Sequence, residues 1–236
     1  MDVSDIIAPL NDAQRDAVAS ENQNMLVLAG AGSGKTRVLV HRIAWLIRAQ
    51  NLSPHSILAV TFTNKAAKEM RGRIEEMLHI PTYSMWVGTF HGIAHRLLKA
   101  HWKEVGLPQN FQILDSDDQL RLVKRVCREL ELDDARWPPK QAQSFINAQK
   151  DEGRRAAHIE IAPGDLYQQV MLQVYRAYEI ACDRGGMVDF AELLLRAHEI
   201  WLRSPQVLAH YQNRFQQILV DEFQDTNTIQ YAWLRV

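Results

Sequence analysis

The chain has 236 residues, of which 47% are hydrophobic and 23% are charged, and its formal net charge is −1. This composition predicts a globular protein of one or two domains and excludes one coated in positive charge. No apolar run approaches the roughly 20 residues that span a bilayer, and the N-terminus lacks the basic start of a secretory signal. We therefore expect a cytoplasmic protein with no membrane partner, in which Cys127 and Cys182 are buried thiols rather than a disulfide or metal site.

A glycine-rich motif follows an apolar run at residues 25–28. Its sequence is Ala29-Gly30-Ala31-Gly32-Ser33-Gly34-Lys35-Thr36, and a helical pattern continues from Arg37 to Ala49. The small residues let backbone N–H groups surround an anion, Lys35 can reach the β- and γ-phosphates, and the Thr36 hydroxyl can bind Mg²⁺. This order predicts a phosphate-binding loop, although Ala29 replaces the usual first glycine. The alternative is a tight strand-to-helix connection without a ligand.

A second motif lies far downstream, where the apolar segment 217–220 leads into Asp221 and Glu222. This pattern is typical of a Walker B element, in which Asp221 holds Mg²⁺ through its water shell. Glu222 then stands where a carboxylate can orient and deprotonate the water that attacks the γ-phosphate. The pair therefore favours hydrolysis over phosphoryl transfer. The alternative is that the two acidic residues cap a helix that starts near Thr226.

The order of elements predicts an α/β fold. Short β-rich apolar segments at 25–29, 57–62, 85–89 and 217–221 indicate strands, with helical patterns between them. Strand signals nearly vanish from residue 90 to 213, where amphipathic helices dominate. We therefore predict a parallel-sheet domain made of residues 1–89 and 214–236, and an inserted all-helical domain made of residues 90–213.

Two loops are expected to leave the C-terminal ends of strands, which is where open α/β sheets bind ligands. The first is residues 61–64, with Asn64 as the N-cap of a helix that runs to about Leu78. The second is residues 88–92, which lead into another helix. Within the helical segment, Ser116 and Gln119 have the spacing of a capping box.

Basic residues are bunched in three segments, as a local nucleic-acid groove requires, although most charge runs are solvated helix faces. The clusters are Lys65, Lys68, Arg71 and Arg73, then Arg96, Lys99 and Lys103, then Arg121, Lys124, Arg125 and Arg128. His91 and His95 share a helix face but lack both the glutamate of the zinc-protease motif and a third ligand. For His91 we expect a phosphate or base contact rather than a metal.

Taken together and in order, these motifs resemble the N-terminal part of the UvrD/Rep/PcrA-type superfamily 1 DNA helicases. Leu10–Gln14 resembles the adenine-recognising Q motif, Ala29–Arg37 motif I, Ala59–Met70 motif Ia, Val87–His95 motif Ib, and Asp221–Thr226 motif II. Ile113–Ser116 and Val188–Phe190 resemble further family motifs. The resemblance covers essentially the whole chain.

This resemblance implies a RecA-like phosphate-loop NTPase domain with ATP and Mg²⁺ as cofactors, and it gives a role to each matching residue. The implied nucleotide-binding residues are Gln14, Ala29, Gly30, Ala31, Gly32, Ser33, Gly34, Lys35, Thr36 and Arg37, with Gln14 and Arg37 at the adenine end. Thr36 and Asp221 would hold Mg²⁺, while Lys35, Glu222 and Gln224 would act in catalysis, Gln224 by coupling the nucleotide to DNA. The implied DNA contacts are Phe62, Thr63, Asn64, Thr89, His91 and Phe190. Burial is the alternative for Phe62 and Phe190.

The function implied is that of a 3′–5′ ATP-dependent helicase in DNA repair, acting on single-stranded DNA and on junctions between single and double strands, with repair proteins as further partners. Family members continue beyond motif II with further helicase domains, including a second RecA-like domain that supplies arginines to the ATP site. We therefore expect this chain alone to bind nucleotide but to lack unwinding activity.

Two rival functions stay open at this stage. One is a regulatory module that uses ATP as a switch and binds protein rather than DNA. The other is a small P-loop kinase or GTPase. The kinase or GTPase is disfavoured because Glu222 supplies a base suited to hydrolysis and the helical insertion carries no lid or guanine-reading pattern.

Overall fold

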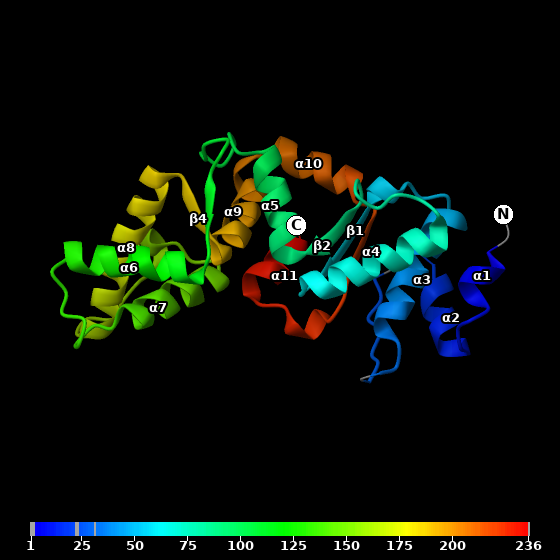
Figure 1. Cartoon of the computed structure of the whole chain (residues 1–236), viewed down its shortest axis with the longest axis horizontal. Coiled ribbons are helices and arrows are strands. Elements are labelled where there is room, and N and C mark those ends of the chain that lie inside the picture. The colour runs from blue at the N-terminus through cyan, green and yellow to red at the C-terminus, as the bar shows by residue number, and fades with distance from the viewer. Residues whose placement is uncertain (1–2, 22–23, 31, 236) are drawn as a thin grey trace. The chain divides into compact units, whose positions relative to one another are not determined.

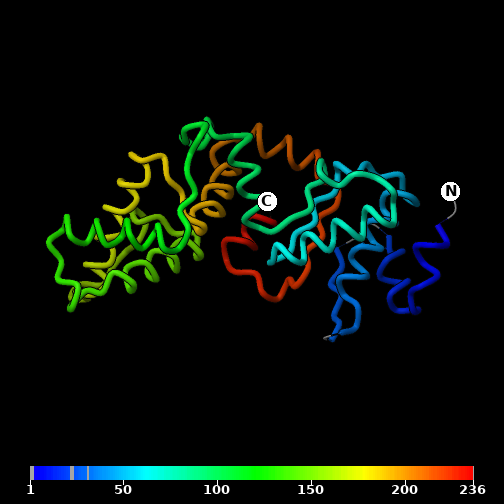
Figure 2. The backbone as a smooth tube through the Cα atoms, in the orientation of Figure 1, coloured from blue at the N-terminus to red at the C-terminus, as the bar shows by residue number. Residues whose placement is uncertain are grey.

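The computed structural model describes residues 3–21, 24–30 and 32–235. These residues form two compact units (Figure 1). The first unit contains the described residues of Met1–Ile93 and Ala209–Asp225, and the second those of Ala94–Leu208 and Thr226–Val236. Helices α5 (Phe90–Ala100) and α10 (Pro205–Arg214) each begin in one unit and end in the other. Figure 2 follows the backbone out of the first unit through α5 and back into it through α10.

The first unit is built on a three-stranded parallel sheet. Its strands are β1 (Ile57–Thr61), β2 (Trp86–Thr89) and β5 (Gln217–Val220), in the order β2-β1-β5. The central strand β1 is buried along its whole length, as expected for an apolar strand covered on both faces. Thr61 pairs with Thr89, and Val60 pairs with Val220, so the three C-terminal ends lie at one edge of the sheet. The α/β prediction with a parallel sheet is confirmed.

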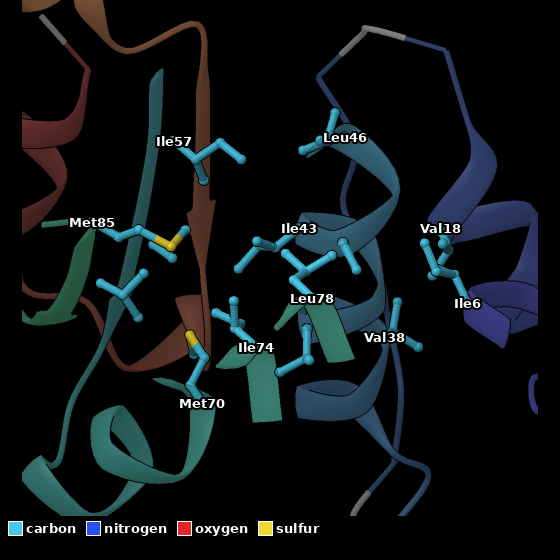
Figure 3. Packing of buried hydrophobic residues seen from close by; sticks show 14 of the residues in the cluster. Ile6, Val18, Val38, Ile43, Leu46, Ile57, Met70, Ile74, Leu78 and Met85 are labelled. Atoms are coloured by element: carbon cyan, nitrogen blue, oxygen red, sulfur yellow. The ribbon is translucent and has the colours of Figure 1, made fainter. Parts of the chain in front are cut away.

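The other elements of the first unit are helical. They are α1 (Ser4–Ile7), α2 (Asp12–Ala19), α3 (Lys35–Arg48) and α4 (Asn64–Leu78), together with the 3₁₀ turns η1 (Pro54–Ser56) and η3 (Phe223–Asp225). Figure 3 shows α3 between the strands and the pair α1 and α2: Ile43 points toward the strand that carries Ile57, and Val38 faces the side of Ile6 and Val18. The phosphate-loop helix is therefore fixed by apolar contacts on two opposite faces.

The strand predicted at residues 25–29 is wrong. Residues 24–30 have no regular secondary structure, and the side chains of Leu26 and Leu28 are 68% and 85% exposed. A strand is stabilised by hydrogen bonds to a neighbour and by packing on its faces, which an apolar sequence alone does not supply. Among the described residues β5 is an edge strand, and this segment does not pair with it.

The second unit is mostly helical. Its helices are α6 (Ser116–Glu129), α7 (Pro139–Asp151), α8 (Leu166–Gly185), α9 (Phe190–Arg203) and α11 (Thr228–Leu234), with the 3₁₀ turn η2 (Ala156–His158). A core between α6, α7 and α8 contains Val123, Ile146 and Met171, and both cysteines are buried in it as free thiols. Within the described ranges, every helix is too short or too polar to cross a bilayer.

The second unit also contains a small parallel sheet that the sequence pattern does not predict. Strand β3 (Gln112–Leu114) pairs with β4 (Met187–Asp189), in register from Gln112 with Met187 to Leu114 with Asp189. Each strand has three residues, which is too short for an alternating pattern to stand out from its flanking helices.

Two predicted helix caps move by one residue. The hydroxyl of Thr63, not the side chain of Asn64, accepts a hydrogen bond from the Ala66 N–H at 3.1 Å, because Thr63 has the extended backbone of an N-cap. Likewise Asp115 rather than Ser116 caps α6, where its carboxylate accepts from the Asp118 N–H. Gln119 takes no part in a capping box there, and its side chain is buried, with 3% of the residue exposed.

Candidate nucleotide and DNA site

The phosphate loop turns through two left-handed glycines, Gly32 at φ 75° and Gly34 at φ 88°. Such values strain any residue with a Cβ, so the glycines shape the turn. The Ser33 hydroxyl donates a 2.6 Å hydrogen bond to the Gly30 carbonyl and closes the loop on itself. Helix α3 begins directly at Lys35, which places Lys35 and Thr36 in its first turn. Ala31, predicted to belong to the loop, lies outside the described residues.

Gln14 connects the start of α2 to the phosphate loop. Its amide nitrogen donates to the Ser33 carbonyl at 3.1 Å, and its amide oxygen accepts from the Asn11 N–H at 3.1 Å. The Asn11 side chain in turn accepts from the Gln14 N–H and completes a capping box. The spacing Asn-x-x-Gln is a signal from which the role of Asn11 could have been predicted. Arg37, the other residue predicted at the adenine end, donates to the Pro9 carbonyl at 2.9 Å.

The two motifs predicted to share a phosphate site meet in the first unit. Lys35 Nζ lies 3.3 Å from Glu222 Oε2, and the Thr36 hydroxyl donates to Asp221 Oδ2 at 3.5 Å. The Asp221 N–H donates to the Val60 carbonyl at 2.9 Å, which fixes the pair at the C-terminal end of the sheet. Glu222 has a left-handed φ of 53°, a strained value that often marks functional residues.

The neighbouring carboxyl groups of Asp221 and Glu222 differ in acidity. Burial and the nearby charge of Glu222 raise the pKa of Asp221. The hydrogen bond from the Gln224 side chain, followed by the contact with Lys35, lowers the pKa of Glu222. Glu222 is therefore held as a carboxylate on the outside of the pair, in the form that a general base needs.

Thr36 and Asp221 together fit a magnesium ion, because each supplies an oxygen and Mg²⁺ binds hard oxygen ligands. No group of three His, Cys, Asp or Glu side chains is arranged to hold a metal in the described part of the chain. Mg²⁺ at nucleotide sites uses one or two protein ligands, with water and phosphate oxygens completing its shell.

Five of the six predicted DNA contacts lie where β1 and β2 end and the next helices begin. The loop predicted at residues 88–92 is wrong, because β2 runs directly into α5, so Thr89 ends the strand and His91 lies in the first turn of the helix. The Phe62 ring is partly buried against Phe90, with centroids 5.3 Å apart. Thr63 and Asn64 are exposed at the start of α4, whereas Thr89 is only 9% exposed and its hydroxyl accepts from the Gly92 N–H. Burial lowers the pKa of the fifth residue, His91, which disfavours the charged form of its imidazole. The sixth, Phe190, belongs to the second unit and is 48% exposed.

Several residues of the predicted basic clusters are engaged locally. Arg73 pairs with Glu69 on α4, Arg121 pairs with Asp118 on α6, and Arg71 donates to the Val87 carbonyl. Lys65 and Lys68 are exposed on α4, close to the loop that carries Phe62. Lys65 and Lys68 are therefore the residues of the first cluster best placed for phosphate contact.

A glycine-rich turn at the start of a helix, facing an Asp-Glu pair at the end of a parallel strand, defines a phosphate-loop protein of the nucleotide-binding α/β class. The family model of the UvrD/REP helicase N-terminal domain matches residues 10–236, and the chain belongs to this family.

Individual relatives agree with the family. The chain is 63% identical over its whole length to DNA helicase II of Escherichia coli (strain K12), of which it covers 33%, and equally similar to DNA helicase II of Salmonella typhimurium. It is 39% identical over 98% of its length to the ATP-dependent DNA helicase PcrA of Bacillus subtilis (strain 168), of which it covers 31%. The chain thus spans about a third of the length of the curated relatives it matches.

Proposed function

We propose that this chain is the ATP- and single-stranded-DNA-binding part of a 3′–5′ ATP-dependent DNA helicase that acts in DNA repair. The observation that carries the proposal is the meeting of Lys35 with Glu222, and of Thr36 with Asp221, at the C-terminal edge of the parallel sheet. The names of the relatives, DNA helicase II and ATP-dependent DNA helicase PcrA, support the same activity. Residues 1–89 and 214–236 would form the ATP-binding domain, and residues 90–213 the inserted domain, although α11 near the end of the first set packs in the second compact unit.

The geometry suggests how nucleotide changes the site. A γ-phosphate beside Lys35 would compete with Glu222 for the ammonium group of Lys35, because Lys35 Nζ lies 3.3 Å from Glu222 Oε2. Lys35 would move to the phosphate and leave Glu222 as an ionised base, still held by Gln224. Thr36 and Asp221 would hold Mg²⁺, which neutralises charge on the phosphates when bound. The Gln14 side chain would give up its hydrogen bond to the Ser33 carbonyl and form hydrogen bonds with adenine instead.

DNA would bind beside the nucleotide at the ends of β1 and β2. Phe62 offers one ring face for stacking, while Thr63 and Asn64 offer polar contacts to the strand. Cycles of unwinding need a second ATPase domain that closes on the site and supplies arginines. We therefore propose that the C-terminal helicase domains of the relatives are the main partners of this chain, which is inactive or very weak by itself.

A dT oligonucleotide tests the DNA half of the proposal. We expect saturable binding in fluorescence anisotropy, with an affinity that falls as salt rises, because each neutralised phosphate releases counterions. Nucleotide binding without any salt-sensitive binding of dT would instead favour a nucleotide-switched module that contacts protein. Strand unwinding by the chain with no added partner would contradict the proposed dependence on further domains.

Replacing Gln14 with Ala tests the adenine assignment. We expect the affinity for a fluorescent ATP analogue to fall about 5- to 150-fold, since a glutamine amide paired with adenine contributes about 1–3 kcal/mol of discrimination. The affinity for the matching GTP analogue should change much less. An equal loss for both analogues would show that Gln14 acts only by holding the loop through Ser33.

A further inference from the structure

A lysine is buried in the second unit among carboxylates. Lys150 of α7 is 1% exposed, and its Nζ lies 2.6 Å from Asp189 Oδ2 and 2.9 Å from Glu192 Oε2. Asp189 ends β4 and Glu192 lies in the first turn of α9. Their side chains are 2% and 4% exposed. Burying charges at this depth costs several kcal/mol per ion before pairing, so the arrangement needs an explanation.

The cluster extends through two arginines. Arg155 binds Glu192 at 2.7 Å and Glu199 at 2.7 Å, and Arg196 also binds Glu192. Burial acts to lower the pKa of Lys150, but the charges of Glu192 and Asp189 outweigh it and raise that pKa. Burial acts to raise the pKa of Glu192, but Lys150, Arg155 and Arg196 outweigh it and lower that pKa. Folding therefore favours the charged forms of Lys150 and Glu192, which pair with each other.

The Asp189 carboxylate joins the buried cluster to the backbone of α9. Its Oδ1 accepts from the Glu192 N–H at 2.7 Å and caps α9. Its Oδ2 accepts from the Tyr178 hydroxyl at 2.7 Å and from the Gln119 amide at 3.2 Å, in addition to Lys150. Four donors from four places in the unit therefore fix one carboxylate.

Phe190 lies between the two buried acids in the sequence. It is the first residue of α9, its neighbour Asp189 is the N-cap, and Glu192 follows two positions later. Both acids are buried, whereas Phe190 is 48% exposed. The aromatic side chain of Phe190 thus lies at the surface, while Asp189 and Glu192 on either side of it are fixed in the interior by ion pairs with Lys150.

Simple stabilisation is a poor explanation for this design, because apolar side chains of similar volume stabilise a core as well as buried ion pairs or better. What directed ionic bonds add is orientation, since each bond fixes an angle as well as a distance. Orientation matters for Phe190, because a ring that is to stack on a base needs a defined plane.

We propose that the Lys150–Asp189–Tyr178 cluster positions Phe190 as a platform on which an unpaired base stacks, so that Lys150 and Tyr178 are positioning residues for single-stranded DNA. This inference rests on the proposed function. Stacking is indifferent to sequence because every base has a π-face. The platform therefore contributes affinity that does not depend on salt, in contrast to phosphate contacts.

Two tyrosines of α8 give a matched test. Tyr178 and Tyr175 are both fully buried, and each donates one hydrogen bond, Tyr178 to Asp189 and Tyr175 to the Arg154 carbonyl at 2.9 Å. Tyr178→Phe and Tyr175→Phe each remove one buried hydroxyl and keep the ring. We expect Tyr178→Phe to weaken binding of a dT oligonucleotide about 2- to 10-fold, as a lost hydrogen bond would. Tyr175→Phe should leave that affinity unchanged.

Phe190→Ala completes the experiment. We expect it to weaken dT binding about 5- to 150-fold without changing the salt dependence. In the Phe190→Ala background, Tyr178→Phe should have no further effect, which is the signature of one residue acting through another. Urea denaturation of each variant checks that Tyr178→Phe and Tyr175→Phe cost similar stability.

Each other outcome overturns the inference. Equal effects of Tyr178→Phe and Tyr175→Phe on dT affinity would show that the hydroxyls matter only for stability. Additive effects with Phe190→Ala would separate Tyr178 from the ring. If Phe190→Ala weakens dT binding and Tyr178→Phe does not, the positioning role fails while the proposed function stands. If the unsubstituted chain does not bind dT, the proposed DNA function fails and this inference with it.

Discussion

Replacing Lys35 with Ala should abolish tight binding of a fluorescent ATP analogue in the presence of Mg²⁺. Lys35 is the cation at the start of α3, and its ammonium group is 3.3 Å from Glu222, where a γ-phosphate would compete for it. A hydrogen bond to a charged group contributes about 1.5–3 kcal/mol, so the dissociation constant should rise about 10- to 150-fold. Equilibrium titration followed by fluorescence anisotropy measures it.

Lys140→Ala is the matched control, because Lys140 is an exposed lysine of α7 in the other unit and the substitution removes the same charge. We expect it to bind the analogue as the unsubstituted chain does. Equal binding by the Lys35 variant would mean that the loop does not grip the phosphates. Failure of the folded, unsubstituted chain to bind would mean that the nucleotide site needs a domain beyond this chain.

The parts of the site that the sequence predicts well are those whose chemistry is local. The glycines before Lys35 are required by left-handed backbone, and Gly32 and Gly34 have that conformation. The strand at 217–220 and the acids after it are adjacent in the sequence, so their pattern could be recognised directly. Bringing Asp221 to Thr36 needed only the general rule that functional loops gather at the C-terminal edge of a parallel sheet.

The parts that the sequence does not predict depend on a partner elsewhere in the chain. The apolar segment 25–28 looks like a strand, yet no described strand pairs with it. Lys150 and Glu192 look like solvated residues of amphipathic helices, because most charged residues are exposed. Only the fold brings them together, along with an arginine from the loop after α7. The i and i+4 spacings of Glu192 with Arg196 and of Glu199 with Arg203 were local hints of ion pairs.

Replacing Glu192 with Gln should destabilise the second unit strongly. Three cations contact this one carboxylate, namely Lys150, Arg155 and Arg196. Its neutralisation leaves them repelling one another in a site where Glu192 itself is only 3% exposed. Removing one partner of a buried ion pair typically costs about 3–5 kcal/mol. Urea denaturation followed by far-ultraviolet circular dichroism should show a lower midpoint or an early separate transition.

Glu179→Gln is the matched control for this substitution. Glu179 makes a single contact with the same cluster, to Arg155 at 3.3 Å. Burial raises the pKa of Glu179, so the folded state stabilises its charged form less than it stabilises that of Glu192. We expect a cost of about 1 kcal/mol or less, the size of one hydrogen bond. Equal losses of stability in the two variants would show that stability depends on the total charge of the cluster and not on the three contacts of Glu192.

The acid sensitivity of the chain gives an independent check on Glu192. Its folded pKa is lowered from an ordinary value of 4.5, so the unfolded state binds more protons as pH falls below that value. The stability that Glu192 contributes is therefore complete above about pH 4.5 and is lost as the pH falls toward its lowered pKa. Glutamine cannot titrate, so the gap between the Glu192→Gln variant and the unsubstituted chain should narrow in acid. A gap that stays constant as the pH falls would place the stabilising charge on another residue.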